Sequence, residues 1–195
     1  MLCYDVSTIV FKYVNFKTKH QFKKTNKNYN KNEITDLYTV KHIYSKKLND
    51  KILMNYKNVN KINAYDNNKI KNLNNLKKLK ILDAQYDCGI NDNGIKNINL
   101  KNLNACYNHN KITDVNHMTN LEDLDASYDC GIDDNGIKNL NLKKLYAFGN
   151  PKITDVNHMT NLEELEVGND CGIDNKGNKN INLKKHWLIT QKLQM

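Results

Sequence analysis

The chain has 195 residues, enough for one domain or a short repeat array, and carries a formal net charge of +9 at pH 7. All 30 of its basic residues are lysines, which attract phosphate but lack the forked donor that arginine uses to read guanine edges. Because the lysines are spread along the whole chain, the composition predicts a solvated basic surface and argues against a dedicated nucleic-acid groove.

Residues 1–36 form the first predicted unit, a small helical module. Asp5 lies near the start of its helix, where a carboxylate is favoured. The same aspartate interrupts the apolar N-terminus, which argues against a secretory signal. No stretch reaches the ~18 apolar residues of a membrane span. We therefore expect an intracellular protein, cytoplasmic or nuclear, that is neither secreted nor bound to a membrane. The apolar residues of this helix follow amphipathic spacing: Val6, Ile9, Val10, Tyr13 and Val14.

The same segment resembles an F-box, through Leu2-x-x-Asp5-Val6-x-x-x-Val10-Phe11-x-Tyr13-Val14 and the TNKNY stretch at 25–29. In that family a helical module docks on the adaptor subunit of a cullin-type ubiquitin ligase, and repeats behind it recruit the substrate. Cys3 replaces the family's proline, and residues 17–24 are richer in lysine than the family pattern. The alternative is a helical cap that only covers the first edge strand of the following array. The resemblance implies the adaptor-docking residues Leu2, Asp5, Val6, Val10, Phe11 and Val14.

A repeat with a period of about 41 residues organises residues 37–195. The sequence ITDVNHMTNLE occurs twice, at Ile112–Glu122 and Ile153–Glu163. Each period holds two half-units with the spacing L-x-x-L-x-A, as in Leu121, Leu124 and Ala126. No single half-unit can bury its apolar face, so we expect stacked coils that share one continuous core.

These half-units resemble leucine-rich repeats: DCGIDDNGIKNL is similar to the cysteine-containing class, and NPKITDV to the short asparagine class. The resemblance implies an α/β leucine-rich-repeat solenoid, with short parallel strands on the concave face and turns or short helices on the convex face. We expect about seven coils from residue 37 onward. Leu37 and Val40 would be the first and second leucines of a degenerate first coil, and His186 would occupy a core position of the last fragment.

Several recurring residues have expected structural roles. Cys88, Cys130 and Cys171 recur at one repeat position two coils apart, too far for a disulfide, so they should be buried free thiols. His117 and His158 are equally far apart, so we expect no metal site. Asn108 and its counterparts should bond inward-facing backbone, and the aspartates of the ITD and IDD segments should cap convex turns. Glycines suit the sharp corners: Gly89, Gly94, Gly131, Gly136, Gly172 and Gly177.

Outward positions of the strands are rich in aromatic and acidic residues. Aromatic residues with polar neighbours are typical of binding hot spots, and the carboxylates favour a basic or amphipathic protein segment over nucleic acid. Alternatively, Tyr86, Tyr107 and Tyr128 form a ladder that shares its own stacking area, without a partner. The predicted partner-binding residues of the concave face are Tyr65, Asp83, Tyr86, Tyr107, Asp125, Tyr128, Tyr146, Phe148, Glu166 and Trp187.

No motif for catalysis is present in the sequence, neither a phosphate-binding glycine loop nor a nucleophile elbow nor a zinc-protease helix. Cys106 should lie on the outer face near Tyr107 and His109, but repeat spacing supplies no oriented base for a nucleophile. We therefore expect a monomeric, non-enzymatic adaptor without cofactor or metal. The first hypothesis is an F-box/leucine-rich-repeat substrate receptor, and the alternative is a stand-alone leucine-rich-repeat scaffold.

Overall fold

The computed structural model describes residues 35–38, 46–168, 170–179, 181 and 183–189, and for residues 185–189 it describes the backbone. The docking residues implied by the F-box resemblance, Leu2, Asp5, Val6, Val10, Phe11 and Val14, lie outside these residues, as does Val40.

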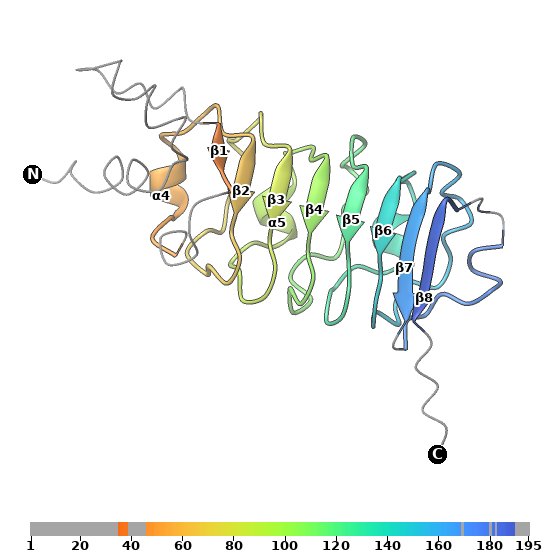
Figure 1. Cartoon of the computed structure of the whole chain (residues 1–195). Helices are drawn as coiled ribbons and strands as arrows, with labels where there is room; N and C mark the ends of the chain where they lie inside the picture. The colour runs from red at the N-terminus through yellow and green to blue at the C-terminus, as the bar shows by residue number, and fades with distance from the viewer. Residues whose placement is uncertain (1–34, 39–45, 169, 180, 182, 190–195) are drawn as a thin grey trace, which may run out of the picture.

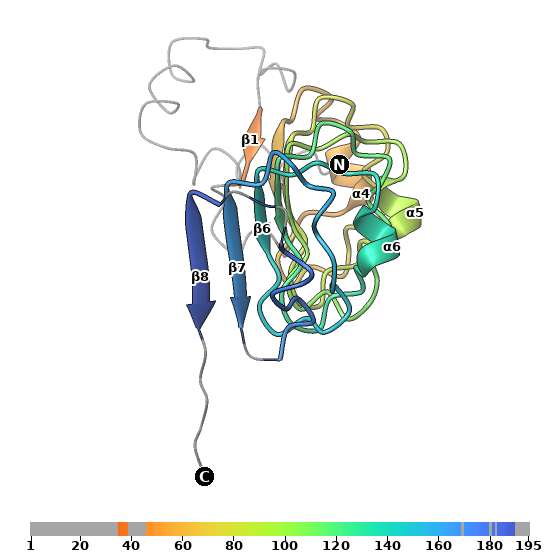
Figure 2. The same cartoon turned by 90° about the vertical axis from the view of Figure 1, so that its right-hand side faces the viewer.

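Eight short strands form one parallel sheet in chain order, so each winding of the chain adds the next strand (Figure 1). Viewed along the stack, the strands form one side and the short helices of the described residues lie on the other (Figure 2). This arrangement confirms a leucine-rich-repeat solenoid. The strands are β1 (Asp36–Leu37), β2 (Lys61–Asn63), β3 (Ile81–Asp83), β4 (Asn102–Asn104), β5 (Asp123–Asp125), β6 (Lys144–Tyr146), β7 (Glu164–Gly168) and β8 (Lys185–Ile189). Within the part of the chain that the structure describes, the helices are α4 (Asp50–Leu53), α5 (Asp92–Ile95) and α6 (Asp134–Ile137).

The core is a set of apolar rows that run from winding to winding. Leu82, Leu103, Leu124 and Leu145 pair in register on β3 to β6, as the repeat predicts. All four are buried, and the small residue two positions later is a fully buried alanine in each of these windings. Because each strand contributes one large and one small apolar residue to the core, a single winding buries little and depends on its neighbours.

The first winding differs from the expected register. Leu37 pairs with Ile62 and therefore lies in the row of second leucines, whereas the sequence pattern placed it in the row of first leucines. The connection between β1 and β2 is longer than the connections between later strands, so a fixed repeat spacing gives the wrong register for β1. At the other end His186 pairs with Leu165, at the register position expected for it.

The short helix α6 on the convex side is capped by an aspartate of the IDD segment, as the sequence predicts. The Asp133 carboxylate accepts the Gly136 N–H at 2.9 Å at the start of α6. Asp134, in the first turn of the same helix, accepts the Thr154 N–H of the next winding at 2.8 Å. Asp133 therefore caps the start of α6, and Asp134 connects the helix to the neighbouring winding.

Gly94 and Gly136 are required by close approach between windings, which corrects the expectation that they serve sharp corners. Neither has a left-handed φ. A Cβ atom on Gly136 would lie 2.1 Å from the Thr113 carbonyl oxygen, and one on Gly94 would lie 2.1 Å from that of Lys71. Only a residue without a side chain lets the helix pack this tightly on the preceding winding.

Candidate functional site

Five aromatic rings form a continuous row along the carboxyl ends of strands β2 to β6. The aromatic row consists of Tyr65, Tyr86, Tyr107, Tyr128 and Phe148. Successive ring centroids lie 4.9, 5.2, 4.4 and 5.4 Å apart. The three central tyrosines are stacked, with interplanar angles of 23° and 10°, while the end rings are tilted at 50° and 64°. The tyrosine ladder considered from the sequence is therefore present, and Tyr65 and Phe148 extend it.

The central tyrosines of the aromatic row hold a left-handed backbone. Tyr86, Tyr107 and Tyr128 have φ values of 55°, 52° and 58°. The same turn is left-handed at Asp66 and Gly149 in neighbouring windings, so the turn itself demands this conformation. A bulky side chain rarely adopts it, at a cost of about 1–2 kcal/mol per residue relative to glycine. Gly149 and Asp66 were the sequence signal for this conformation, because glycine and aspartate tolerate it.

Polar side chains at the ends of the strands shape the turn that carries the aromatic row. In each case the side-chain oxygen accepts the backbone N–H two residues later, which closes a local turn. Asp83 accepts from Gln85 at 3.2 Å and Asp125 from Ser127 at 3.0 Å. We call Asn63, Asp83, Asn104 and Asp125 the Asx row; Asn63 and Asn104 make the same bond at 2.9 and 3.0 Å.

Burial distinguishes the predicted acidic contact residues from one another. Asp83 is 5% exposed, so its carboxylate serves the turn and offers a partner little surface. Burial raises the pKa of Asp83, and the charge of Asp125 adds to this. Burial also raises the pKa of Asp125, which is half-buried. Glu166 is exposed. The binding role of all three remains a prediction, and Glu166 presents its charge most openly.

The outward side of β2 to β7, which we call the strand face, carries more acid than base. Its carboxylates are Asp83, Asp123, Asp125, Glu164 and Glu166, and its lysines are Lys61 and Lys144. Lys144 forms an ion pair with Glu164 at 2.8 Å, and Asn102 donates to Asp123 at 3.0 Å. Tyr146 is half-buried in this face, and burial together with the Asp123 charge raises its pKa. Trp187 pairs with Glu166 in register, but its side chain is not among those that the structure describes.

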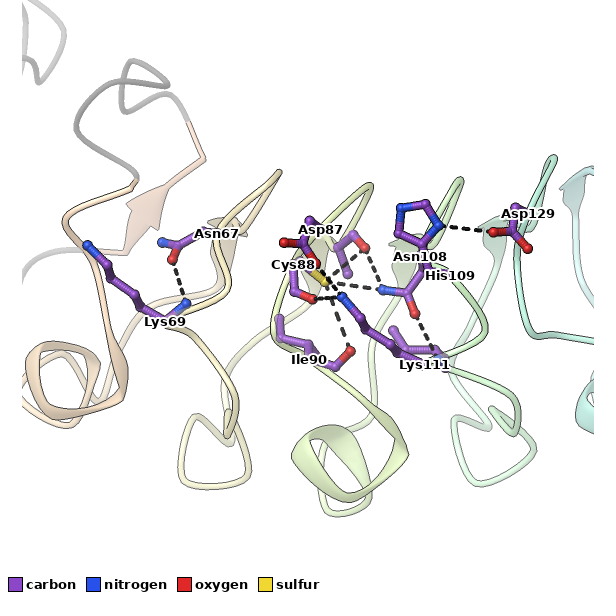
Figure 3. Close-up of polar contacts among 11 residues, drawn as sticks. Asn67, Lys69, Asp87, Cys88, Ile90, Asn108, His109, Lys111 and Asp129 are labelled. Carbon is purple, nitrogen blue, oxygen red and sulfur yellow. Dashed lines mark hydrogen bonds and ion pairs between the residues drawn. The ribbon is translucent and has the colours of Figure 1, made fainter.

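Buried asparagine and cysteine side chains connect neighbouring windings of the solenoid (Figure 3). The Asn108 amide donates to the Ala84 carbonyl at 2.8 Å and lies 3.2 Å from the Cys88 sulfur. Its oxygen accepts the Ile112 N–H at 2.8 Å. The Cys88 thiol donates to the Ala84 carbonyl at 3.0 Å. The inward role expected for asparagine is confirmed, and Cys88 is buried and free as expected, with a hydrogen-bonding role that its apolar character did not suggest. Cys130 is likewise buried and free, whereas Cys171, in the last cysteine-type winding, is free but only partly buried, which corrects the expectation for it.

The cysteine thiols near this site are protonated at neutral pH. Burial raises the pKa of Cys88 and of Cys130 to about 11. Cys106, expected on the outer face, is 8% exposed instead, and burial with the nearby Asp125 charge raises its pKa to about 12. A thiol needs a lowered pKa to act as a nucleophile. His109 bonds Asp129 at 3.0 Å, on the side away from Cys88 in Figure 3.

No group of three potential metal ligands gathers among the residues that the structure describes, and none of the helices within that part is long and apolar enough to cross a membrane. No protein-family model and no curated protein matches the chain. Among solved structures it is similar to internalin C2 from Listeria monocytogenes, at 22% sequence identity over 70% of this chain and 74% of that chain, with a TM-score of 0.44.

Proposed function

We propose that this chain is a non-enzymatic protein-binding scaffold whose partner contacts the aromatic row and the neighbouring strand face. The observation that carries the proposal is the left-handed backbone of Tyr86, Tyr107 and Tyr128. Glycine or asparagine would fit this turn at lower cost. Strained residues persist where surrounding structure holds them, and they cluster at binding sites. Stacking alone offsets the strain, but it does not explain why large rings occupy the turn in three consecutive windings.

The chemistry of the partner follows from the strand face. The chain as a whole has a net charge of +9, yet five carboxylates face two lysines on this surface. A polyanion is repelled here, whereas a basic or amphipathic protein segment is attracted. Stacking hides most of the ring faces, but Tyr86 remains 39% exposed. Tyrosines of this kind supply large, rigid contact area with a polar end, which suits a protein interface.

The test removes rings without disturbing the turn. Asparagine tolerates a left-handed φ, so Tyr86→Asn and Tyr128→Asn should fold normally. We expect proteins captured from a cell lysate by the wild-type chain to be lost with the double variant. Met54→Asn is the matched control, since Met54 is 61% exposed beside the helix α4, away from the aromatic row. Unchanged capture by a folded double variant would contradict the proposal.

We further propose that residues 1–36 dock this scaffold on the adaptor subunit of a cullin-type ubiquitin ligase. The support is the F-box-like sequence pattern alone. The measurement is binding of the full chain to purified adaptor subunit, with Val10→Asp and Phe11→Asp as the disrupting variants. We expect these variants to lose the adaptor while keeping proteins bound through the aromatic row. If the wild-type chain binds no adaptor, the stand-alone scaffold is the correct alternative.

A further inference from the structure

The spacing of the aromatic row limits what can lie along it. Each winding contributes one ring, and successive centroids are 4.4–5.4 Å apart. An α-helix advances ~5.4 Å per turn. An extended strand places side chains of one face ~6.7 Å apart, and a polyproline helix advances ~9 Å per turn. Of these three conformations, only the α-helix has a repeat that stays close to the ring spacing over the four steps from Tyr65 to Phe148, so that each helical turn lies beside one ring.

The width of the strand face suits the same occupant. The strands β2 to β6 have three residues each, which corresponds to a length of ~10 Å. An α-helix with its side chains is ~10–12 Å in diameter. A helix that crosses the strands along the stacking direction therefore covers their length. The aromatic row, which follows directly after these strands, would then run along one side of the helix.

The carboxylates of the strand face lie on alternate strands. Asp83 is on β3, Asp123 and Asp125 are on β5, and Glu164 and Glu166 are on β7, while β2, β4 and β6 carry no carboxylate. Strands two windings apart are separated by ~9.6 Å. Seven residues of an α-helix rise ~10.5 Å. Basic side chains at every seventh position of a helix would therefore meet successive acidic strands.

We propose that the strand face binds an amphipathic α-helix of a partner protein, aligned with the stacking direction. Its apolar side chains contact the aromatic row, and basic side chains spaced by seven residues face β5 and β7, whose carboxylates are less buried than Asp83 on β3. This inference rests on the proposed scaffold function and adds the conformation, orientation and charge pattern of the partner segment. The spacing of the rings, the width of the face and the alternation of its carboxylates all carry it.

Synthetic peptides test the proposed conformation and charge pattern. The probe is a fluorescein-labelled, alanine-based peptide of 21 residues with leucines on one face and a lysine at every seventh position beside them. Its isomer has the same composition with the lysines on the opposite face, and a third peptide has two central prolines that prevent a helix. We expect fluorescence anisotropy to show the first peptide binding the full chain at least about tenfold more tightly than either other peptide. Equal affinity of the isomers, or undiminished binding of the proline peptide, would overturn the inference.

Two charge reversals in one winding test the location. Glu166→Lys changes the strand face and should weaken binding of the first peptide about tenfold. Glu163→Lys makes the same change just before β7, where Glu163 pairs with Lys184 at 3.0 Å, and should alter affinity less than about twofold. If Glu166→Lys and Glu163→Lys weaken binding of the first peptide equally, the peptide does not bind on the strand face. If Tyr86→Asn and Tyr128→Asn abolish lysate capture while the peptide isomers bind equally, the scaffold function stands and the helix inference fails.

Discussion

Replacing Tyr107 by alanine and by glycine should separate the strain of the aromatic row from its stacking. Tyr107 has a φ of 52° and stacks on Tyr86 and Tyr128, with centroids at 5.2 and 4.4 Å. Both substitutions remove two ring contacts worth about 0.5–1.5 kcal/mol each. Alanine retains a Cβ in the left-handed turn, at about 1–2 kcal/mol, whereas glycine does not. Both variants should be less stable than the wild type, with glycine the more stable of the two.

The entropy of glycine in the unfolded chain must be subtracted from this comparison. It favours alanine over glycine by about 0.4–1 kcal/mol wherever alanine fits. Gln85, which precedes Tyr86 and has no left-handed φ, supplies that reference through the pair Gln85→Ala and Gln85→Gly. The alanine-to-glycine difference at residue 107, minus that at residue 85, should therefore equal the strain itself, about 1–2 kcal/mol.

Urea unfolding followed by circular dichroism gives the four free energies of unfolding by linear extrapolation. Glycine should be the more stable variant at residue 107 and the less stable one at residue 85. If the alanine-to-glycine difference at residue 107 is no larger than that at residue 85, the turn holds no strain. The reason for regarding the tyrosines as a retained binding surface would then be gone.

Three further substitutions test residues that are buried or closely packed. In thermal melts, Gly136→Ala should destabilise the fold by roughly 2 kcal/mol or more, because its Cβ would lie 2.1 Å from the Thr113 carbonyl oxygen. The control Asn135→Ala, in the same helix, should have little effect. Asn108→Ala should cost roughly 2–4 kcal/mol in urea titrations by leaving the buried Ile112 N–H without its acceptor, whereas exposed Asn97→Ala should change stability by less than about 0.5 kcal/mol. Burial raises the pKa of Asp83 in the folded state, so ionisation of this carboxyl lowers the stability of the fold as pH rises through the folded-state pKa. Asp83→Asn should therefore have a higher urea midpoint than the wild type at pH 7, and the difference between the two midpoints should disappear near pH 3.

The leucine rows were predictable because they depend on spacing alone. Leu82, Leu103 and Leu124 recur at a fixed interval, and stacking in register is the only way to bury them together. Leu37 was misplaced because its winding is longer than the rest, so the interval no longer gives the register. Sequence spacing succeeds where every winding has the same length and fails where one does not.

The chemistry of the candidate site was only partly predictable. Alternation along a strand correctly places Asp83 and Asp125 outside the core, but it cannot show that each side chain turns back to a backbone N–H. It also cannot give the left-handed φ of Tyr107, which depends on the turn after the strand. The reason for Gly136 lies in an inter-winding distance, which exists only in the folded chain.

Asparagine has a structural use on the convex side that the sequence pattern did not suggest. Asn116 donates to the Asn135 carbonyl of the next winding at 2.7 Å and accepts the Asn139 N–H at 2.8 Å. Asn74 makes the same pair of bonds one period earlier, to Asn93 and Asn97, each at 2.8 Å. An amide supplies donor and acceptor at once, so one asparagine per period connects two windings, and a carboxylate could not replace it.

The two-winding period of this chain has a consequence for recognition. Cysteine-type and asparagine-type half-units alternate, so every chemical feature that belongs to one type recurs on every second strand. The carboxylates of the strand face follow this rule on β3, β5 and β7, while the rings of the aromatic row recur in every winding from Tyr65 to Phe148. The partner helix that we propose would match both periods, with apolar contacts at each step and basic contacts at every second step. A helix with one turn per winding and a basic side chain per seven residues meets both conditions, because two helical turns and two strand spacings are both ~10 Å.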